Sequence, residues 1–573
     1  MLLFVIAVYE LYYSIFYEDW VIFLSRYLKF FREPFFYYFL VVSIWFMSFC
    51  SYTSPLFYFD YSPDNNCFFT VGKAMMHGIL PYRDVFEQKG PYVYLIHGIA
   101  SLMSGRSLLG MFPFEVLSLL MTMIVVYMIA GLYIHKSTAG IIAIFSPVFQ
   151  LFHPYYTYGD TVESFLFPAM LMLIYSLLRA DQENLKLSKA GWAIQGFLVG
   201  LTFLMKYTLL GGWIIFYIWI FIEYVTDKRY RDIQRLILWS LLGFLIAIVP
   251  WLIYFLVTHS LAAFIHVYFY ENMHVYMLSD NSVFAKFLES LTIYSSFLRQ
   301  DPLIFVCGFI GLIYLMFTNS IFKTWHGKAL FVAMMISNAA FVVYGYHAGQ
   351  VYQYYELAFF PYIVVPSVFL LIQLFKFYQF KITKVNESQI FIGSVLISLF
   401  LVLGVNNNIL SSKIFPNNAS VTLQSTTKPQ QPAQIIFGNI MRQQSHGRPT
   451  LLNYGSIDMG FYTTSGALPT NYYFQNYNIA YNKAPQIMNS QNESIKKAKT
   501  QWVVVNTPAG KNIKQWRGTG SKKISAGNLN PGTKKISKVM LRNYRVVALH
   551  TQNFENTNVA YWLLKRKSAK PSD

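Results

Sequence analysis

Ionisable side chains occur in four short segments that are otherwise apolar and aromatic. These residues are Asp60 and Asp64 in FDYSPDNNCFF, Asp84, Glu87 and Lys89 in YRDVFEQKGPYVY, Asp160 and Glu163 in YYTYGDTVESF, and His347 and Glu356 in GYHAGQVYQYYELAFFPY. A carboxylate beside an apolar wall can act as a general base, because desolvation raises its pKa. A lysine nearby can hold a phosphate as a compact point charge. Together these residue types favour a group-transfer site.

Several of these residues also have simpler interpretations. Asp60, Asp84 and Glu87 could be solvated loop charges. Asp160 and Glu163 are three residues apart, which places them on one face of a helix. Asp160 could instead cap that helix, with Glu163 at its third position as in a capping box, and capping would not exclude a functional role.

Two further positions have alternative structural interpretations. Lys206 joins two apolar runs and could simply extend its ammonium to the membrane surface. His347 could be a structural interface residue rather than part of a site. Gly196 and Gly200 form a GxxxG pair, which indicates close packing of two helices.

The elements that must position these residues are membrane helices. Hydrophobic residues make up 55% of the 573 residues and charged residues 12%, whereas soluble proteins carry about 25% charged residues. This composition excludes a soluble multidomain protein, a disordered chain and a coiled coil. Since a span needs about 20 apolar residues, we predict about eleven spans: 37–52, 113–134, 139–156, 162–178, 191–205, 208–225, 236–258, 302–318, 329–345, 358–375 and 390–405.

Lys and Arg clusters between the spans predict the orientation, because cytoplasmic loops carry an excess of these residues. The clusters lie at 26–32, 135–136, 179–189, 228–235, 323–328 and 376–384. The opposite side then holds 56–112, 157–161, 206–207, 259–301, 346–357 and everything after 406. We therefore predict a multi-pass protein of the cytoplasmic membrane, with its N-terminus inside and its C-terminal domain outside.

The chain is predicted to have three parts. Residues 1–34 form an N-terminal interfacial or cytoplasmic segment, and a twelfth span would require residues 1–25 to cross the membrane. Residues 35–406 form the transmembrane domain, whose first outer loop is 56–112. This loop is long enough to be functional, and Pro91–Met103 within it could form an amphipathic surface helix.

Residues 407–573 are predicted to form a soluble extracytoplasmic α/β domain. They contain 22 of the 45 Lys and Arg residues but only 4 of the 26 Asp and Glu residues, and none of the three cysteines. Strand-like runs are Thr450–Asn453, Trp502–Asn506, Tyr544–His550 and Ala560–Leu564, and Ser490–Lys499 has a helical pattern. Residues 507–538, rich in Gly, Lys and Ser, are predicted to be a loop. The excess of positive charge would attract polyanions or anionic lipid headgroups, or dock the domain on an anionic membrane surface.

Motifs of several enzyme classes are absent from the sequence. It contains no P-loop GxxxxGK[ST], no GxGxxG after a strand, no HExxH and no zinc-like spacing of Cys and His. ATP hydrolysis, dinucleotide chemistry and zinc proteolysis therefore have no support in the sequence.

The segment from Asp64 to Pro91 resembles the first outer loop of GT-C superfamily glycosyltransferases. More narrowly, it resembles the bacterial branch related to protein O-mannosyltransferases and the lipid A aminoarabinose transferase. The shared pattern is an acid, a helix with small residues, G-x-x-P-Y-x-D, and then K-G-P or K-P-P. It is formed here by Asp64, Gly72, Gly78, Pro81, Tyr82, Asp84, Lys89, Gly90 and Pro91. The motif covers about 30 residues, and the predicted spans and outer C-terminal domain extend the likeness to the whole chain.

The resemblance implies a polytopic α-helical GT-C fold and an inverting transferase whose donor is a polyprenyl-phosphate sugar. It implies that Asp64 is the catalytic base, with Asp60 and Asp84 as fallback acids. Lys89 would contact the donor phosphate, with Tyr82 beside it. Further implied positions are Asp160 and Glu163, which would form a second acidic site for the acceptor, the sugar or a divalent metal.

The sequence departs from the family pattern in two places. Many relatives carry a His-Tyr pair in a later outer loop, where this chain has Gln353, Tyr354 and Tyr355, with His347 upstream. The second phosphate contact is therefore His347, Tyr355 or neither. The first loop also lacks the adjacent Asp and Glu of eukaryotic protein O-mannosyltransferases, which argues against a protein acceptor.

The predicted reaction is sugar transfer to an acceptor hydroxyl outside the cytoplasmic membrane of a bacterium. The predicted acceptor is an anionic envelope polymer such as teichoic acid, another cell-envelope glycan or a lipid; nucleic acid is not expected. The alternative is a transporter or flippase of a lipid-linked saccharide. A transporter would carry charged or broken helices at mid-membrane, often in paired halves, whereas the charges here lie at the outer span ends.

Overall fold

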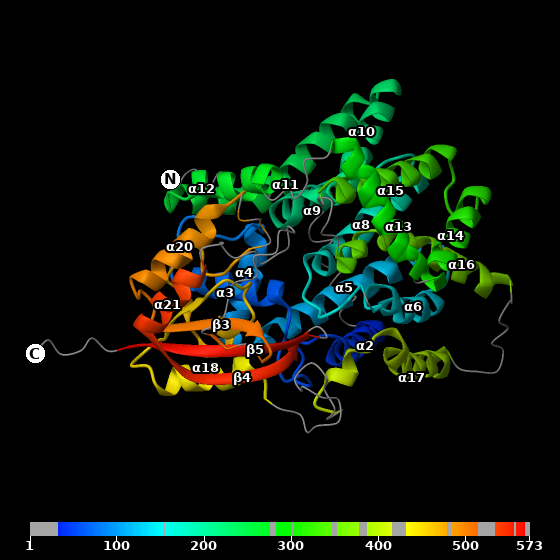
Figure 1. Ribbon diagram of the computed structural model, residues 1–573. Helices are drawn as coiled ribbons and strands as arrows, with labels where there is room; N and C mark the ends of the chain where they lie inside the picture. Colours follow the sequence, from blue (N-terminus) through cyan, green and yellow to red (C-terminus); the bar gives the residue numbers. More distant parts are fainter. Residues whose placement is uncertain are drawn as a thin grey trace, which may run out of the picture.

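The computed structural model describes most of the chain as a bundle of helices joined to a mixed sheet domain (Figure 1). Residues outside the description are 1–32, 154, 276–281, 301, 346–351, 378–386, 415–430, 478, 480, 482, 511, 514–532, 555–556 and 568–573. The predictions for 1–25 and for His347 therefore lie outside the described residues.

The bundle consists of apolar helices connected mainly by short segments. They are α2 (Pro34–Cys50), α5 (Phe112–Ala130), α6 (Lys136–Phe145), α7 (Pro147–Gln150), α8 (Val162–Gln182), α9 (Lys189–Lys206), α10 (Gly211–Thr226), α11 (Tyr230–Val257), α12 (Leu261–Phe264), the π-helix η3 (Ile265–Val275), α13 (Val283–Gln300), α14 (Pro302–Phe317), α15 (Trp325–Gly345), α16 (Pro361–Phe377) and α17 (Glu387–Val405). Short 3₁₀ helices are η1 (Leu108–Met111), η2 (Tyr207–Leu209), η4 (Gln353–Ala358) and η5 (Asn408–Ser411).

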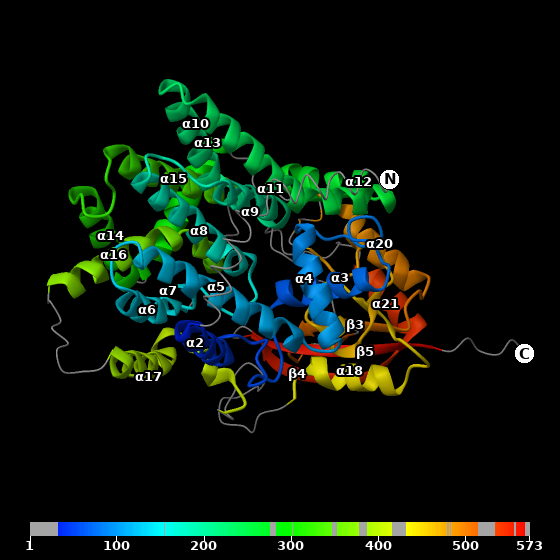
Figure 2. The ribbon, with the colours of Figure 1, turned by 180° about the vertical axis from the view of Figure 1, so that it is seen from behind.

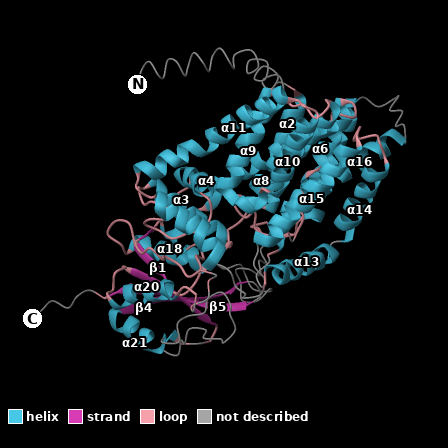
Figure 3. Cartoon of the chain, turned by 90° about the horizontal axis from the view of Figure 1, so that it is seen from above, coloured by secondary structure: helices cyan, strands magenta, loops and turns pink. Residues whose placement is uncertain are grey.

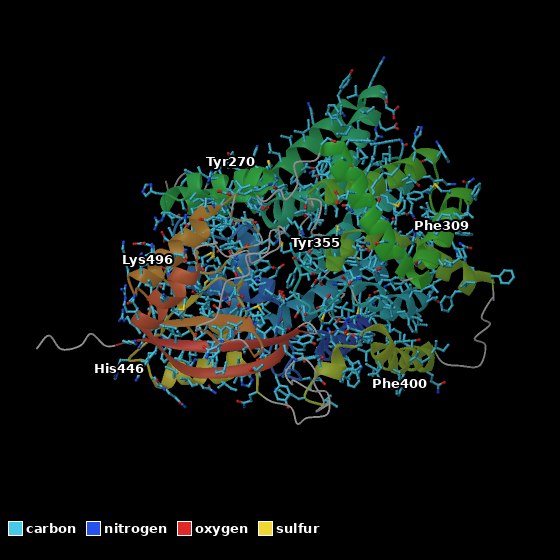
Figure 4. The ribbon with its side chains drawn as sticks, in the orientation of Figure 1. Tyr270, Phe309, Tyr355, Phe400, His446 and Lys496 are labelled. Carbon is cyan, nitrogen blue, oxygen red and sulfur yellow. The ribbon has the colours of Figure 1, made fainter. Side chains whose placement is uncertain are left out.

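Five stretches of the described chain are long and apolar enough to cross a membrane. They are Leu108–Ala130, Val162–Gln182, Tyr230–Val257, Trp325–Val343 and Ser388–Val405. Shorter apolar helices are Pro34–Cys50, Pro91–Met103, Gly211–Thr226, Gly308–Phe317 and Pro361–Phe377. Phe309 and Phe400 are 54% and 75% exposed, and Figure 4 shows both at the outer surface of the bundle, as expected for side chains that face lipid. The chain is therefore a multi-pass membrane protein.

One predicted span differs from the structure. The span predicted at 139–156 is divided into α6 and α7 at Pro147, because proline has no backbone N–H to continue the first helix. The outer segment predicted at 259–301 contains α12, η3 and α13. The predicted close packing of Gly196 is confirmed: a Cβ there would lie 1.9 Å from the Ser240 carbonyl oxygen on α11.

The long loop 56–112 contains two helices that pack against each other. They are α3 (Pro63–Met76) and α4 (Pro91–Met103), and α4 coincides with the predicted surface helix. A Cβ on Gly72 would lie 2.5 Å from backbone atoms of α4, so the glycine allows this close approach. Seen from behind, α3 and α4 lie between the bundle and the sheet (Figure 2).

The C-terminal residues form a five-stranded mixed sheet in the order β2-β1-β3-β5-β4. Its strands are β1 (Thr450–Asn453), β2 (Leu468–Pro469), β3 (Trp502–Pro508), β4 (Tyr544–Phe554) and β5 (Thr557–Arg566). Helices α18 (Ala433–Gln443), α19 (Phe461–Ser465), α20 (Pro485–Lys496) and α21 (Thr533–Asn543) accompany it. The four predicted strand runs are found, whereas α21 begins inside the predicted loop 507–538. Viewed from above, this α/β domain lies at one end of the bundle (Figure 3).

Candidate active site

A cavity of about 290 Å³ lies where the loops 56–112 and 157–161 meet the C-terminal domain. Its lining includes Asp64, Lys89, Asp160, Glu163 and Lys206. Figure 4 shows Tyr355, which belongs to the same region, between the helical bundle and the C-terminal domain. The structure thus brings four of the predicted site residues, from three separate segments, into one cavity.

Asp64 reaches the cavity from the first turn of α3. Ser62 caps this helix by accepting a hydrogen bond from the Asn65 backbone N–H, and Pro63 occupies the first turn, where its missing N–H costs nothing. The Tyr354 hydroxyl donates a hydrogen bond to Asp64 Oδ2 at 2.8 Å. Among the residues that the structure describes, Asp64 forms no ion pair.

Lys89 is held by its backbone rather than by its ammonium. The Tyr82 hydroxyl donates to the Lys89 carbonyl oxygen at 2.7 Å, and the Lys89 N–H donates to the Tyr94 hydroxyl at 2.9 Å. The Lys89 ammonium lies 5.7 Å from the centre of the Phe68 ring. It has no ion-pair partner within the described part of the chain, so a cation remains available to a ligand.

Gly90 permits the approach of Lys89 to α9. A Cβ at this position would lie 1.9 Å from the Leu204 carbonyl oxygen, two residues before Lys206. The K-G-P segment therefore requires glycine because the loop packs directly on the end of a helix.

Asp160, unlike Asp64 and Lys89, is surrounded by buried hydrogen-bond partners. His97 Nε2 lies 3.0 Å from Asp160 Oδ2, and the Asp160 N–H donates to Glu115 Oε1 at 2.7 Å. Asp160 has a φ of 54°, a left-handed conformation that non-glycine residues rarely adopt. Burial raises the pKa of Asp160, and the neighbouring His97 opposes this rise. The Glu115 carboxylate also accepts hydrogen bonds from Ser51, Thr53 and Tyr156.

Glu163 lies in the first turn of α8 and forms an ion pair with Lys206. The side chains of Glu163 and Lys206 are 1% and 10% exposed, and the Lys206 ammonium lies 4.3 Å from the centre of the Tyr355 ring. Lys206 therefore faces the site, which corrects the interpretation that it only extends to the membrane surface. The N-cap of α8 is Thr161, whose hydroxyl accepts from the Ser164 N–H, so Asp160 is not the cap.

Some predicted site residues lie elsewhere in the loop. Tyr82 is buried and supports Lys89 without lining the cavity. Asp60 is also buried and accepts hydrogen bonds from the Ser62 N–H and the Asn65 amide, at 2.8 and 2.9 Å. Asp84 is exposed and pairs with Arg83 at 2.8 Å. The solvated-charge interpretation is thus correct for Asp84 and wrong for Asp60.

The solvated-charge interpretation is also wrong for Glu87, which is buried near a smaller cavity of about 70 Å³. The Cys67 thiol donates to Glu87 Oε2 at 3.0 Å, and the Gln88 N–H donates to Oε1 at 2.8 Å. Burial raises the pKa of Glu87, and the hydrogen bond from Cys67 opposes this rise. Tyr355 and Gln475 line the same small cavity, so the C-terminal domain contributes to its wall.

The C-terminal domain docks on α3 through buried polar contacts. The Thr70 hydroxyl donates to Asp458 Oδ2 at 2.7 Å, and the Lys73 ammonium donates to the Tyr462 carbonyl oxygen at 2.9 Å. Burial raises the pKa of Asp458 to about 6 and lowers that of Lys73 to about 7. Because α3 also carries Asp64, this docking orients the helix that presents the carboxylate.

Sequence reasoning missed the partners of the predicted residues. Tyr354 was noted only as part of a departure from the family pattern, and His97 and Glu115 were not considered. His97 offered one signal: it lies on the predicted surface helix 91–103, as an ionisable residue among apolar neighbours. Among the described residues, no three His, Cys, Asp or Glu side chains are grouped as they would be to hold a metal ion. Asp160 and Glu163 fit a metal poorly, because their carboxylates already contact His97 and Lys206, respectively.

Part of the chain matches a known protein family, and its fold is similar to solved structures. Residues 88–254 match the family described as dolichyl-phosphate-mannose-protein mannosyltransferase. Crystal structures of ArnT from Cupriavidus metallidurans, bound to undecaprenyl phosphate and in the apo state, match with TM-scores of 0.55 and 0.54. Each is 12% identical in sequence, and the match covers 91% of this chain and 97% of that chain. The search of curated proteins gives no match.

The chain has a GT-C fold. At 12% identity the likeness to ArnT describes the fold alone, and the match over 88–254 adds the enzyme class. Together they confirm the predicted membrane glycosyltransferase of the GT-C superfamily. The matched segment begins one residue before Lys89 and ends within α11, so it contains Lys89, Asp160, Glu163 and Lys206.

Proposed function

We propose that this GT-C glycosyltransferase moves a sugar from a polyprenyl-phosphate donor to an acceptor hydroxyl on the outer face of the cytoplasmic membrane. The observation that carries the proposal is the pairing in one cavity of a carboxylate, Asp64, and an ammonium, Lys89, neither of which forms an ion pair within the described chain. ArnT, which shares the fold, binds undecaprenyl phosphate. A lipid-linked donor is therefore consistent with the cavity.

Lys89 would hold the donor phosphate while the lipid chain lies among the membrane helices. The phosphate is the leaving group, and its developing charge needs neutralisation more than it needs a proton. An ammonium fixed through its backbone by Tyr82 and Tyr94 supplies that charge with little reorganisation. His347 and Tyr355 remain candidates for a second phosphate contact.

Asp64 would act as the general base. As the acceptor oxygen attacks the anomeric carbon, its proton moves to an Asp64 carboxylate oxygen. The bond between the anomeric carbon and the phosphate oxygen breaks, and its electron pair leaves with the lipid phosphate. Attack from the face opposite the phosphate inverts the anomeric centre. The Tyr354 hydroxyl, bonded to Asp64 Oδ2, orients the carboxylate for this step.

Asp160 and Glu163 would line the part of the site that receives the acceptor or the sugar. For the acceptor we favour an anionic polymer or lipid of the cell envelope, such as teichoic acid, because residues 407–573 hold 22 basic and only 4 acidic residues.

The test is sugar transfer from a panel of polyprenyl-phosphate sugars by purified wild type and Asp64→Asn. We expect the variant to lose about 10²- to 10⁴-fold in turnover, as is typical when a general base is removed. Asp84→Asn is the matched control, because Asp84 belongs to the same loop but is exposed and lines neither cavity. An Asp64→Asn protein that folds normally and transfers at the wild-type rate would refute the assignment.

A further inference from the structure

His97 and Asp160 form a buried contact whose protons can be counted from geometry. The relative exposures of His97 and Asp160 are 2% and 1%. His97 Nδ1 lies 2.7 Å from the Val93 carbonyl oxygen, and Nε2 lies 3.0 Å from Asp160 Oδ2. A carbonyl oxygen can only accept, so Nδ1 must carry a proton.

The second contact then requires one more proton. Either Nε2 is protonated and donates to a carboxylate, or a protonated Asp160 donates to neutral Nε2. In both arrangements the pair has no net charge. Loss of the shared proton would leave a buried carboxylate facing a lone pair, which carries an electrostatic and a desolvation cost.

The surroundings oppose that loss. Glu115 on α5 accepts the Asp160 N–H and is itself buried, so a second uncompensated carboxylate would be repelled. Asp160 Oδ1 has no hydrogen-bond partner among the described residues. The other titratable or charged groups near the pair are Asp60, Asp64, Lys89, Tyr156 and Glu163 with its partner Lys206.

We propose that His97 and Asp160 share one proton, and that His97 is a positioning residue that keeps the Asp160 side of the cavity neutral for the donor phosphate. The inference rests on the proposed function, because it concerns the approach of a phosphate to Lys89. With the shared proton in place, Lys206 balances the charge of Glu163 and His97 balances that of Asp160. Neither pair then adds net charge to this side of the cavity. Without it, the cavity gains one negative charge and repels the phosphate.

The test measures binding of undecaprenyl phosphate to purified protein in nanodiscs between pH 6 and 9. Three proteins are compared: wild type, His97→Gln and Asp160→Asn. The glutamine amide can donate to Asp160 but carries no titratable proton, so the two side chains cannot share one and the pair becomes negative when Asp160 ionises. The asparagine stays neutral at every pH. His446→Gln is the control, because His446 is exposed on the C-terminal domain (Figure 4).

We expect Asp160→Asn to bind tightly at every pH, with only the changes due to the lipid phosphate itself. His97→Gln should bind about three- to tenfold more weakly than Asp160→Asn once its Asp160 carboxylate is ionised, the effect of one charge across a partly hydrated cavity. Wild type should match Asp160→Asn at the pH values at which His97→Gln binds weakly, because the pair keeps its shared proton. This difference between two variants of the same contact is a readout that a merely structural role of His97 would not produce.

Two results would overturn the inference. Wild-type protein that binds as weakly as His97→Gln at every pH would show that the pair holds no shared proton. Wild-type binding by His97→Gln at all pH values would show that the charge of the pair does not matter. If no protein binds the lipid, the proposed donor is wrong as well, and this outcome is distinct from equal binding by all three proteins. Thermal unfolding of each variant separates these results from misfolding.

Discussion

The two sides of the cavity differ in whether their charged side chains have partners of opposite charge. On the side formed by α8 and α9, Asp160 contacts His97 and Glu163 forms an ion pair with Lys206, and both carboxylates are buried. On the side formed by α3 and the K-G-P segment, Asp64 contacts a tyrosine hydroxyl and Lys89 faces a phenylalanine ring. We call these the paired side and the open side.

The difference teaches how such a site can be both stable and reactive. Buried charges are costly unless they are paired, so the paired side supplies fixed polar groups without net charge. The open side keeps a carboxylate and an ammonium that are partly exposed. Only substrates can supply partners for these two charges. Mutations on the paired side should therefore affect folding first, and mutations on the open side should affect chemistry first.

The largest expected effect is on the paired side. Lys206→Met leaves Glu163 buried without its cation, which should cost about 3–5 kcal/mol of stability. Thermal unfolding in detergent measures the loss, and the double variant Lys206→Met with Glu163→Gln should recover most of it. A single variant that remains stable but no longer binds donor would place Lys206 on the open side.

Lys89→Met tests the open side. Removing one charge that stabilises a leaving phosphate should lower turnover by about 10²- to 10³-fold. Its unfolding temperature should stay close to that of wild type, because Lys89 has no ion pair within the described chain. Lys496→Met, on the exposed surface of the C-terminal domain (Figure 4), is the control. A large drop in stability with unchanged turnover would reverse the assignment of the two sides.

Tyr354→Phe should have a smaller effect on the same side. It removes the hydrogen bond to Asp64, and hydrogen bonds to charged groups contribute about 1.5–3 kcal/mol, or roughly 10- to 100-fold in rate. Steady-state transfer kinetics measure the effect, with Tyr352→Phe, a neighbour that also lines the cavity, as the control. Equal rates for both variants would exclude an orienting role for Tyr354.

The smallest effect is expected at Asp458, away from both sides. Because burial raises its pKa from 3.8 to about 6, the folded chain retains this proton to higher pH than the unfolded chain. Protonated Asp458 therefore makes its full contribution to the stability of the folded chain below pH 3.8, and this contribution is lost as the pH rises through about 6. Asp458→Asn should remove this pH dependence of stability. Unfolding temperatures of wild type and the variant, measured at pH 4 to 7, should show it as a difference of about 1–3 °C. Transfer should not change.

Much of the fold could be predicted because apolar runs and turn residues are local signals. The helix at Pro91–Met103 and the strand at Thr450–Asn453 were placed to the residue, since proline and polar residues bound each of them. The break of the predicted span at Pro147 was missed, because hydropathy alone does not record a lost backbone hydrogen bond.

The sequence determined a membrane protein through its composition, and it offered Asp64, Lys89, Asp160 and Glu163 as candidates. Its GT-C character was indicated by the resemblance of Asp64–Pro91 to that superfamily. The tertiary structure alone decided which of these candidates are paired. Tyr354 meets Asp64 across 290 residues and Lys206 meets Glu163 across 43. Such contacts arise when helices distant in sequence pack together, and periodicity along one helix carries no information about the partner it will meet.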